Sequence, residues 1–299
     1  GCGRPVKKDR EKMTELDTKI EQLYHKGQKN IWDGKEFLQE CIEKHGTPNM
    51  SDDDAQALQN IFGIILWGEL AAWKISSALA FTLDNDAARM AATSQAHDEA
   101  RHYYVMRDYL ELLGHVPDKI EKNAEEFLGS ILEADTVAKM LLGMQLMVEP
   151  MALTLFKLVR EKNVDPILSD LLVMYERDEA RHVALGTMYL PKVLSQMSTV
   201  QKVELIVWQF FGYMKQFEML RSLKDDFTAL GIAPRDVFAL ARKKQLKAME
   251  LLSEELGERY PFMDTMLRII DFRNEISFPE SDSGYIDRVR NAVRVAVNG

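Results

Sequence analysis

The sequence predicts an all-α protein built on a four-helix bundle, with additional helices before and after the bundle. Strand-like alternation is rare, and apolar residues recur with helical spacing along most of the chain. The pentapeptide Asp-Glu-Ala-Arg-His occurs at 98–102 and again, 80 residues later, at 178–182. A glutamate stands thirty residues before the glutamate of each copy, at Glu69 and at Glu149. One internal repeat therefore extends over four segments, each of which we expect to be a helix.

The segments up to the first glutamate contain clear helix boundaries. Residues 9–45 are typical of one or two amphipathic helices, broken at the Trp-Asp-Gly sequence of 32–34. Ser51 precedes three aspartates and is a typical N-terminal cap. We expect it to begin a long helix that reaches about Leu83.

The other three bundle helices also have recognisable ends. The helix with the first pentapeptide is expected to end at Leu113, because Gly114 follows. Asp135 is expected to begin the helix of Glu149, and Asp165-Pro166 to cap and begin the helix of the second pentapeptide. Further helices are expected at 198–229, 234–256, 259–273 and 284–297.

The chain lacks an interior linker rich in proline, glycine and serine, so we expect one domain over residues 1–299. Its metal-binding core would cover about 51–192, with helical extensions at 1–50 and 193–299. We expect the C-terminal extension to shape a substrate pocket or to form the surface of a homodimer.

The repeated residues are typical metal ligands. Glutamate and histidine three positions apart share one face of a helix, which applies to Glu99 with His102 and to Glu179 with His182. Glu69 and Glu149 lie in segments that are apolar nearly all round, and a buried carboxylate needs a cationic partner. Pairing them with Arg101 and Arg181 is the alternative, but it leaves the histidines unexplained. We therefore expect all six residues to hold two metal ions.

The twice-repeated Glu-x28-Asp-Glu-x-Arg-His pattern resembles that of the bacterial multicomponent monooxygenase hydroxylases and is similar to that of the acyl-carrier-protein desaturases, both within the ferritin-like di-iron superfamily. The resemblance covers about residues 60–185. It implies a ferritin-like bundle, O2 as co-substrate and the six ligands named above. It also implies that Asp98 and Asp178 support the histidines and that Arg101 and Arg181 lie beside those aspartates. Carboxylate oxygen and imidazole suit two iron ions, or one manganese and one iron.

The chain departs from the related families at three positions. Leu153, with Thr154 beside it, stands where the hydroxylases have a threonine. Met106 stands where the small subunit of ribonucleotide reductase has a radical-forming tyrosine. Tyr175 occupies the place of an additional histidine in the arylamine N-oxygenases, and we expect it near the metals as a hydrogen-bond donor or as a target of self-oxidation.

Helical spacing also predicts residues around a substrate. The positions that share a face with Glu69 or Glu149 are Phe62, Leu66, Trp73, Leu146, Leu153 and Phe156, for which ordinary core packing is the alternative. Gln145 is unusual on an apolar helix, and we expect it to contact substrate or a group behind the ligands. Pro150, directly after Glu149, predicts a local distortion of the helix.

These observations favour an O2-dependent oxidoreductase that hydroxylates, desaturates or oxidises a heteroatom of a small, largely apolar substrate. The alternative is a ferritin-like protein that handles iron or consumes peroxide. The chain has only Cys2 and Cys41, so it cannot hold a four-cysteine iron-sulfur cluster, and we expect electrons from an external reductase or ferredoxin. The net charge of -9 argues against nucleic acid and anionic membranes as partners. We expect no membrane span and a cytoplasmic location, although Cys2 leaves lipid attachment open.

Overall fold

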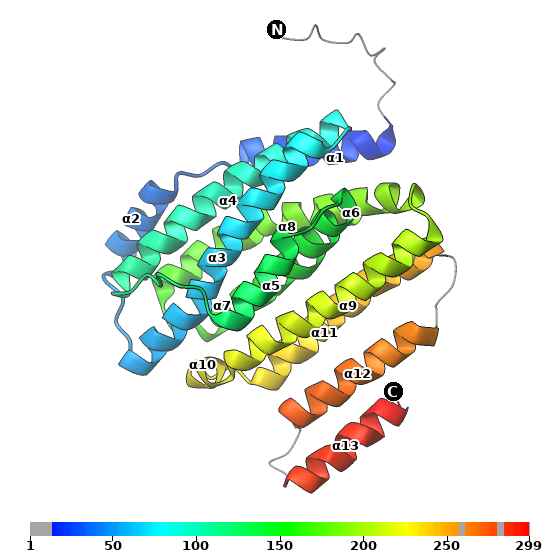
Figure 1. Ribbon diagram of the computed structural model, residues 1–299. Helices are drawn as coiled ribbons and strands as arrows, with labels where there is room; N and C mark the ends of the chain where they lie inside the picture. Colours follow the sequence, from blue (N-terminus) through cyan, green and yellow to red (C-terminus); the bar gives the residue numbers. More distant parts are fainter. Residues whose placement is uncertain (1–13, 257–260, 280–283, 299) are drawn as a thin grey trace, which may run out of the picture.

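The computed structural model describes residues 14–256, 261–279 and 284–298, and every regular element within these ranges is a helix. The predicted all-α class is confirmed (Figure 1). Residues 9–13 of the predicted first helix, and Cys2, lie outside the described residues.

Four long helical segments form the central bundle. They are α3 (Asp52–Thr82), α4 (Asp86–Leu112), a composite segment of α6 (Val137–Met140), η1 (Leu141–Val148) and α7 (Glu149–Lys162), and α8 (Pro166–Ser195). The predicted caps Ser51 and Asp165 both accept hydrogen bonds from backbone N–H groups of the first turn. Short turns connect α3 to α4 and α7 to α8, and the helices of each pair pack against each other. Helix α4 also packs against α8.

The helix of Glu149 is not regular. Thr136, rather than Asp135, caps its start, and η1 is a π-helix of eight residues that ends immediately before Glu149. The distortion predicted from Pro150 is confirmed, because the missing N–H of proline frees a carbonyl oxygen in the preceding turn. The wider π turns carry Gln145 toward the centre of the bundle, where it is fully buried.

Two N-terminal helices cover the side of the bundle formed by α4 and α8. They are α1 (Glu15–Lys29) and α2 (Gly34–His45), and both pack against these two helices (Figure 1). The predicted break between them is confirmed, since α1 ends at Lys29 and the Asp33 side chain caps α2. This packing brings Trp32, in the connection between α1 and α2, to the back of the predicted metal site.

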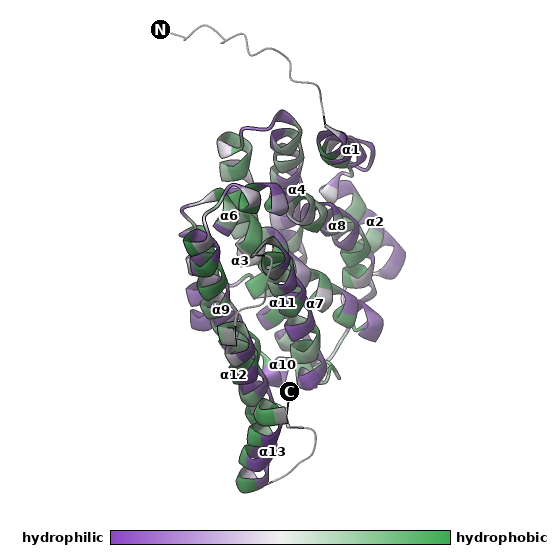
Figure 2. Ribbon diagram, turned by 90° about the vertical axis from the view of Figure 1, so that its right-hand side faces the viewer, coloured by the Kyte–Doolittle hydropathy of each residue, from purple (hydrophilic) through white to green (hydrophobic). Residues whose placement is uncertain are grey.

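The other side of the bundle is covered by helices of later sequence. They are α5 (Lys122–Leu132), α9 (Thr199–Ser222), α10 (Lys224–Ala229) and α11 (Pro234–Leu256). Outside them lie α12 (Pro261–Ser277), which packs on α9 and α11, and α13 (Tyr285–Asn298). Helix α5 was not predicted, and the single helix predicted at 198–229 is two helices that meet at Leu223. In both overall views α13 lies at the end of the molecule away from α1, packed on α12 (Figures 1 and 2).

Two helical stretches are long and apolar enough, by length and composition alone, to cross a membrane: Asp52–Thr82 and Val137–Lys162. They carry Glu69 and Glu149, and their most apolar windows are 50% and 72% buried inside the protein. Buried core helices meet the same criteria, and these two supply much of the apolar core.

Candidate metal centre

The structure brings the six predicted ligand residues together at the centre of the bundle. Each comes from the middle of a long helix except Glu149, which is the first residue of α7 after the π-helix. All six side chains belong to residues that are at most 4% exposed: Glu69, Glu99, His102, Glu149, Glu179 and His182. Acidic residues this deeply buried require cationic partners.

The six residues form two overlapping groups, each able to surround one ion. The first group is Glu69, Glu99, His102 and Glu179, and the second is Glu99, Glu149, Glu179 and His182; within each group the ligand atoms lie within 4.8 Å of one another. Glu99 and Glu179 belong to both groups. The four remaining residues divide evenly, with one glutamate and one histidine on each side.

The shared glutamates present a different oxygen to each side. Glu179 places Oε1 3.0 Å from Nδ1 of His102 and Oε2 3.0 Å from Nδ1 of His182. Glu99 places Oε2 3.5 Å from Nδ1 of His102 and Oε1 3.0 Å from Nδ1 of His182. Each carboxylate is therefore placed to bridge two ions, as in carboxylate-bridged di-metal proteins.

Several of the converging atoms lack a partner that a metal ion would supply. Glu99 Oε2, His102 Nδ1 and Glu179 Oε1 are buried without a hydrogen bond. Buried polar atoms nearly always have hydrogen-bond partners. Three unpaired polar atoms in one place therefore indicate a binding site for another group, such as a metal ion. Four carboxylates and two imidazoles are the donor set that iron or manganese prefers. The residues present therefore fit two such ions.

The two histidines are oriented by aspartates from the opposite copy of the repeat. Nε2 of His102 lies 3.4 Å from Asp178, and Nε2 of His182 lies 3.3 Å from Asp98. A carboxylate can only accept, so in the neutral imidazole the proton resides on Nε2 and the lone pair of Nδ1 faces the glutamates. The two aspartates thus lie beside the histidines, as the resemblance implies, but in a crossed arrangement.

The arginines of the two pentapeptides pair with these aspartates and not with the glutamates. Arg101 donates to Asp98 at 2.6 Å and to Asp178 at 2.8 Å. Arg181 donates to Asp98 at 2.8 Å and to Asp178 at 2.9 Å. The indole N–H of Trp32 also donates to Asp178, at 2.8 Å. The alternative that the arginines neutralise Glu69 and Glu149 is therefore wrong.

Burial and mutual charge shift the acid-base properties of the site. Burial raises the pKa of Glu69 and of Glu149 well above the usual range, and the negative charges of Glu99 and Glu179 raise it further. Burial opposes protonation of both histidines, but hydrogen bonds and charges of the surrounding carboxylates outweigh it and raise the pKa of His102 and His182. Without a metal, the centre therefore holds protons that bound cations must displace.

Tyr175 lies beside the metal centre, where the sequence placed it. Its ring stacks on His102, with centroids 4.2 Å apart, and its hydroxyl group donates to the backbone carbonyl of His102 at 2.6 Å. Burial raises the pKa of the Tyr175 hydroxyl well above 10, so it stays protonated. Tyr175 is therefore a hydrogen-bond donor, as expected, but its acceptor is the backbone carbonyl of the ligand His102. Thr154 likewise donates to its own helix, at the carbonyl of Pro150.

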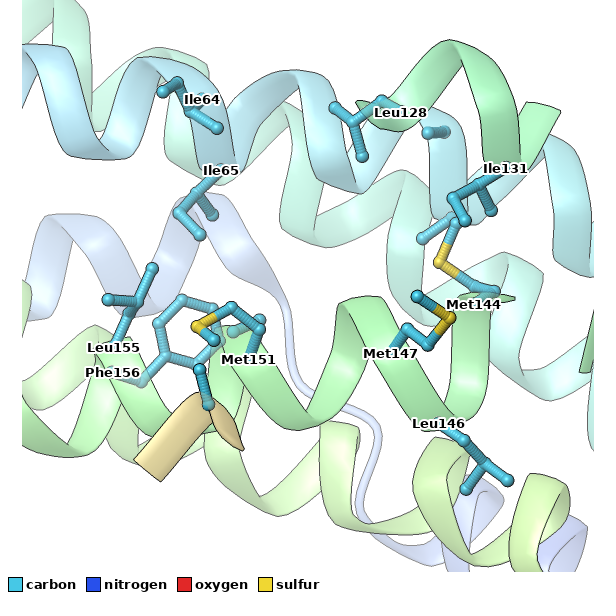
Figure 3. Packing of buried hydrophobic residues seen from close by; sticks show 14 of the residues in the cluster. Ile64, Ile65, Leu128, Ile131, Met144, Leu146, Met147, Met151, Leu155 and Phe156 are labelled. Atoms are coloured by element: carbon cyan, nitrogen blue, oxygen red, sulfur yellow. The ribbon is translucent and has the colours of Figure 1, made fainter. Parts of the chain in front are cut away.

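The residues around the apolar cavity differ from those predicted. A cavity of about 40 Å³ lies between α3 and α7 and touches Glu69 and Glu149. Its other walls include Ile61, Ile65, Ala72, Val148, Met151, Ala152 and Leu155, together with Phe127 and Leu128 of α5, Met219 of α9 and Leu223 between α9 and α10. In Figure 3, Ile65 faces Met151 and Leu155 across the space between the helices.

None of the six residues predicted to line a pocket lines this cavity: Phe62, Leu66, Trp73, Leu146, Leu153 and Phe156. Phe62 and Phe156 stack on each other within the core, and Trp73 is 39% exposed. Helical spacing places neighbouring residues on two sides of each ligand and does not show which side borders a cavity. The cavity lies on the side opposite the predicted residues. The π-helix also rotates the positions before Glu149 relative to a regular helix.

Gln145 lies behind the ligands, and it has a neighbour that the sequence reasoning missed. Gln95, one helical turn before Glu99, donates from Nε2 to Glu149 at 2.9 Å and to Glu99 at 3.1 Å. Its own oxygen accepts from Gln145 at 3.1 Å. Its position in the repeat could have indicated it, because residue 95 is equivalent to residue 175, where Tyr175 was predicted to lie near the metals.

Sequence comparisons do not place the chain in a family. No family model matches it, and neither does a curated protein. Solved structures do match. A Synechococcus protein with aldehyde deformylating oxidase activity superposes with a TM-score of 0.57 and 19% identity, covering 68% of this chain and 92% of that one. The dimanganese(II)-NrdF of Streptococcus sanguinis gives a TM-score of 0.63 at 12% identity, covering 84% and 94%.

The chain has the ferritin-like fold. A variant of an R2-like ligand-binding oxidase with a Mn/Fe cofactor also matches, with a TM-score of 0.61 and 14% identity over 78% of this chain and 93% of that one. The predicted ferritin-like bundle is confirmed by these superpositions. The metal centre described above lies inside the ferritin-like bundle, at the crossing of its four helical segments.

Proposed function

We propose that the protein is an O2-activating oxidoreductase that uses two iron ions, or one manganese and one iron, to oxidise a small, largely apolar organic substrate. The observation that carries this proposal is the pair of overlapping carboxylate and histidine groups bridged by Glu99 and Glu179. Variants of the R2-like ligand-binding oxidase that match this fold contain Mn/Fe or Fe/Fe cofactors, which supports such a pair here. Bound ions of this kind supply the electrons and Lewis acidity needed to reduce O2.

The cavity next to the ligands supports an apolar substrate. Its walls are apolar apart from Glu69 and Glu149, and its volume of about 40 Å³ suits O2 or the end of a small molecule. Met151 and Met219 stand in its wall, and unbranched methionine side chains rearrange readily. A substrate larger than O2 would enter by displacing them. Apolar walls also exclude water from the reacting groups.

A second cavity gives a route from the surface. It has a volume of about 330 Å³, lies between α3, the 115–121 loop and the start of α10, and shares Ile64 and Leu223 with the cavity at the metal centre. Polar side chains line it, among them Asn60, His115 and Lys119. We infer that substrate approaches through this cavity and passes between Ile64 and Leu223. Electrons would come from an external reductase or ferredoxin.

The proposal is tested by loading the protein with Fe(II) without O2, counting bound metal, and then measuring O2 consumption with and without apolar candidate substrates. We expect about two ions per chain. Leu223→Trp should retain both ions but lose the stimulation by substrate, because the larger ring closes the passage. Val200→Trp, at a residue 67% exposed on α9, is the matched control and should behave like the wild type.

Three results would contradict the proposal. These are a protein that binds no metal, one that turns over many Fe(II) ions per chain without an organic substrate, and a Leu223→Trp variant that is stimulated as fully as Val200→Trp. The second result would favour the iron-handling alternative.

A further inference from the structure

At three positions one helical turn from a ligand, the two copies of the repeat carry side chains of different chemistry. Residues 95, 145 and 186 are Gln95, Gln145 and Gly186, whereas the equivalent positions 80 residues away are occupied by Tyr175, Ile65 and Met106. Four of these positions lie one helical turn before a glutamate ligand, and the other two lie one turn after a histidine ligand. The two halves of the site therefore differ next to the ligands.

On the His182 side, Gln95 donates to two of the glutamates. It is 1% exposed, and its Nε2 donates to Oε1 of Glu149 at 2.9 Å and to Oε1 of Glu99 at 3.1 Å. Because carboxylates only accept, the nitrogen of this amide has to face them and its oxygen faces away. One oxygen of Glu149 is thereby engaged by the protein. Glu69 contacts His102, and within the described part of the chain no amide donates to its carboxylate.

Gln145 completes the hydrogen bonding of Gln95. The outward-facing oxygen of Gln95 needs a donor in this buried place, and Nε2 of Gln145 lies 3.1 Å from it. In this orientation the oxygen of Gln145 faces the carbonyl oxygens of Met140 and Leu141. With the amide turned around, Nε2 of Gln145 would donate to these carbonyls at 3.2 and 3.1 Å, and its oxygen would face the oxygen of Gln95. In either orientation Gln145 lies against Gln95, and the hydrogen bonds from Gln95 to Glu99 and Glu149 are unchanged.

Gly186 makes room for this pair. A Cβ atom at residue 186 would lie 2.5 Å from Cβ of Gln145 and 3.4 Å from Cγ of Leu146. The first contact is to the base of a side chain in a packed helix, which cannot move away without shifting η1. The close approach of η1 to α8 thus depends on a glycine one turn after His182.

The His102 side is built from different groups. Tyr175 stacks on His102 and donates to its backbone, and Ile65 belongs to the wall of the apolar cavity. Met106 is fully buried. Among residues 14–256, 261–279 and 284–298, no side-chain amide donates to a ligand on this side as Gln95 does on the other.

From this arrangement we propose that the Gln95–Gln145 pair is a positioning device that makes the two metal positions unequal, by holding Glu149 for the ion beside His182. The inference rests on the proposed di-metal function and adds the residues that differentiate its two positions. Groups that orient metal ligands from behind typically change metal affinity by about 10–100-fold when they are removed. Gln95 also reaches the shared Glu99, but at Oε1, the oxygen that lies 3.0 Å from Nδ1 of His182. Both of its carboxylate contacts are therefore on the His182 side, and its removal should weaken that position more than the other.

The test is a Co(II) titration of the whole protein without O2, followed by visible absorption and calorimetry. The wild type should bind in two distinguishable steps. His102→Ala and His182→Ala serve as references that identify the step belonging to each position. Gln95→Met, which keeps length but cannot donate, should weaken the His182 step by about 10-fold or more and weaken the His102 step less.

Two further variants separate positioning from general damage. Gly186→Ala retains both amides but displaces Gln145, and it should weaken the same step. Tyr175→Phe, at the repeat equivalent of Gln95, should leave the His182 step unchanged. The inference is overturned if Gln95→Met weakens both steps equally, resembles His102→Ala, or binds like the wild type. If the wild type binds no metal, the proposed function itself has failed.

Discussion

Tyr175 and His102 are joined twice: their rings stack with centroids 4.2 Å apart and planes inclined by 18°, and the tyrosine hydroxyl donates to the histidine's own carbonyl group. Asp178 fixes the same imidazole from its other edge. His102 is therefore held on three sides before any metal binds. An imidazole that is already oriented loses little freedom on coordination, which favours tight binding.

Truncation of Tyr175 should separate the two contacts. Tyr175→Phe keeps the stacked ring and should lower the free energy of unfolding by only about 1 kcal/mol. Tyr175→Ala leaves a cavity against His102 and should cost about 3–5 kcal/mol. Chemical denaturation of the metal-free protein measures both values. An equal loss in the two variants would show that the hydroxyl, and not the ring, dominates.

Removal of the charge on Asp178 should weaken metal binding. Asp178→Asn takes away the carboxylate that keeps the proton of His102 on Nε2, and the apparent metal affinity should fall by about 10–100-fold. A competition titration with a chelator measures this change. Asp170→Asn is the control, since Asp170 pairs with Lys44 and His45 away from the site. Matching affinities in the two variants would argue against the orienting role.

Metal affinity should rise with pH. The pKa values of Glu69, Glu149 and both histidines are raised, so protons occupy the metal-free centre at a pH where ordinary carboxylates are already ionised. Incoming ions displace these protons, and a lower proton concentration favours binding. Calorimetry with Mn(II) between about pH 6 and pH 8, in buffers of different ionisation enthalpy, should show proton release. Affinity that is constant over this range would contradict the pKa assignments.

Two glycines in helices should respond to alanine in opposite directions. A Cβ atom at Gly34 would lie 2.2 Å from Cγ2 of Val105, so Gly34→Ala should destabilise the packing of α2 on α4 by about 1–3 kcal/mol. Nothing lies within 4 Å of a Cβ atom at Gly129 in α5. Gly129→Ala should therefore stabilise the protein by about 0.5–1 kcal/mol, through helix propensity alone. Thermal unfolding of the two variants checks both signs.

The bundle and the ligand positions could be predicted because local signals specify them. Ser51 and Asp165 cap their helices through neighbouring backbone groups, and the spacing of Glu99 with His102 follows from helix geometry. Helix α5 was missed because its cap is Glu121, a residue that is not among the preferred N-caps. The extent of the π-helix was not predictable either, since one proline indicates a distortion but not its length.

The sequence could not predict which side of each ligand helix faces the cavity. It also could not predict which distant residues pair with each other. Trp32 reaches Asp178 across 146 residues of chain, and no local pattern announces that contact. The crossed pairing of histidines with aspartates depends on how α4 packs on α8. The cavity faces Ile65 and Ala72 rather than Leu66 and Trp73. The rotation of α3 that decides this is set by its packing against α4, α5 and α10. Helical periodicity alone leaves that rotation undetermined.

The central claim is that six side chains surround two bridged ions. Anomalous diffraction at the iron edge, from crystals loaded with Fe(II), tests it most directly. We predict two peaks, one beside Glu69 and His102 and one beside Glu149 and His182, with Glu99 and Glu179 touching both. A map with no peak among these residues, or with a single peak bound by only one half of the repeat, would contradict the claim.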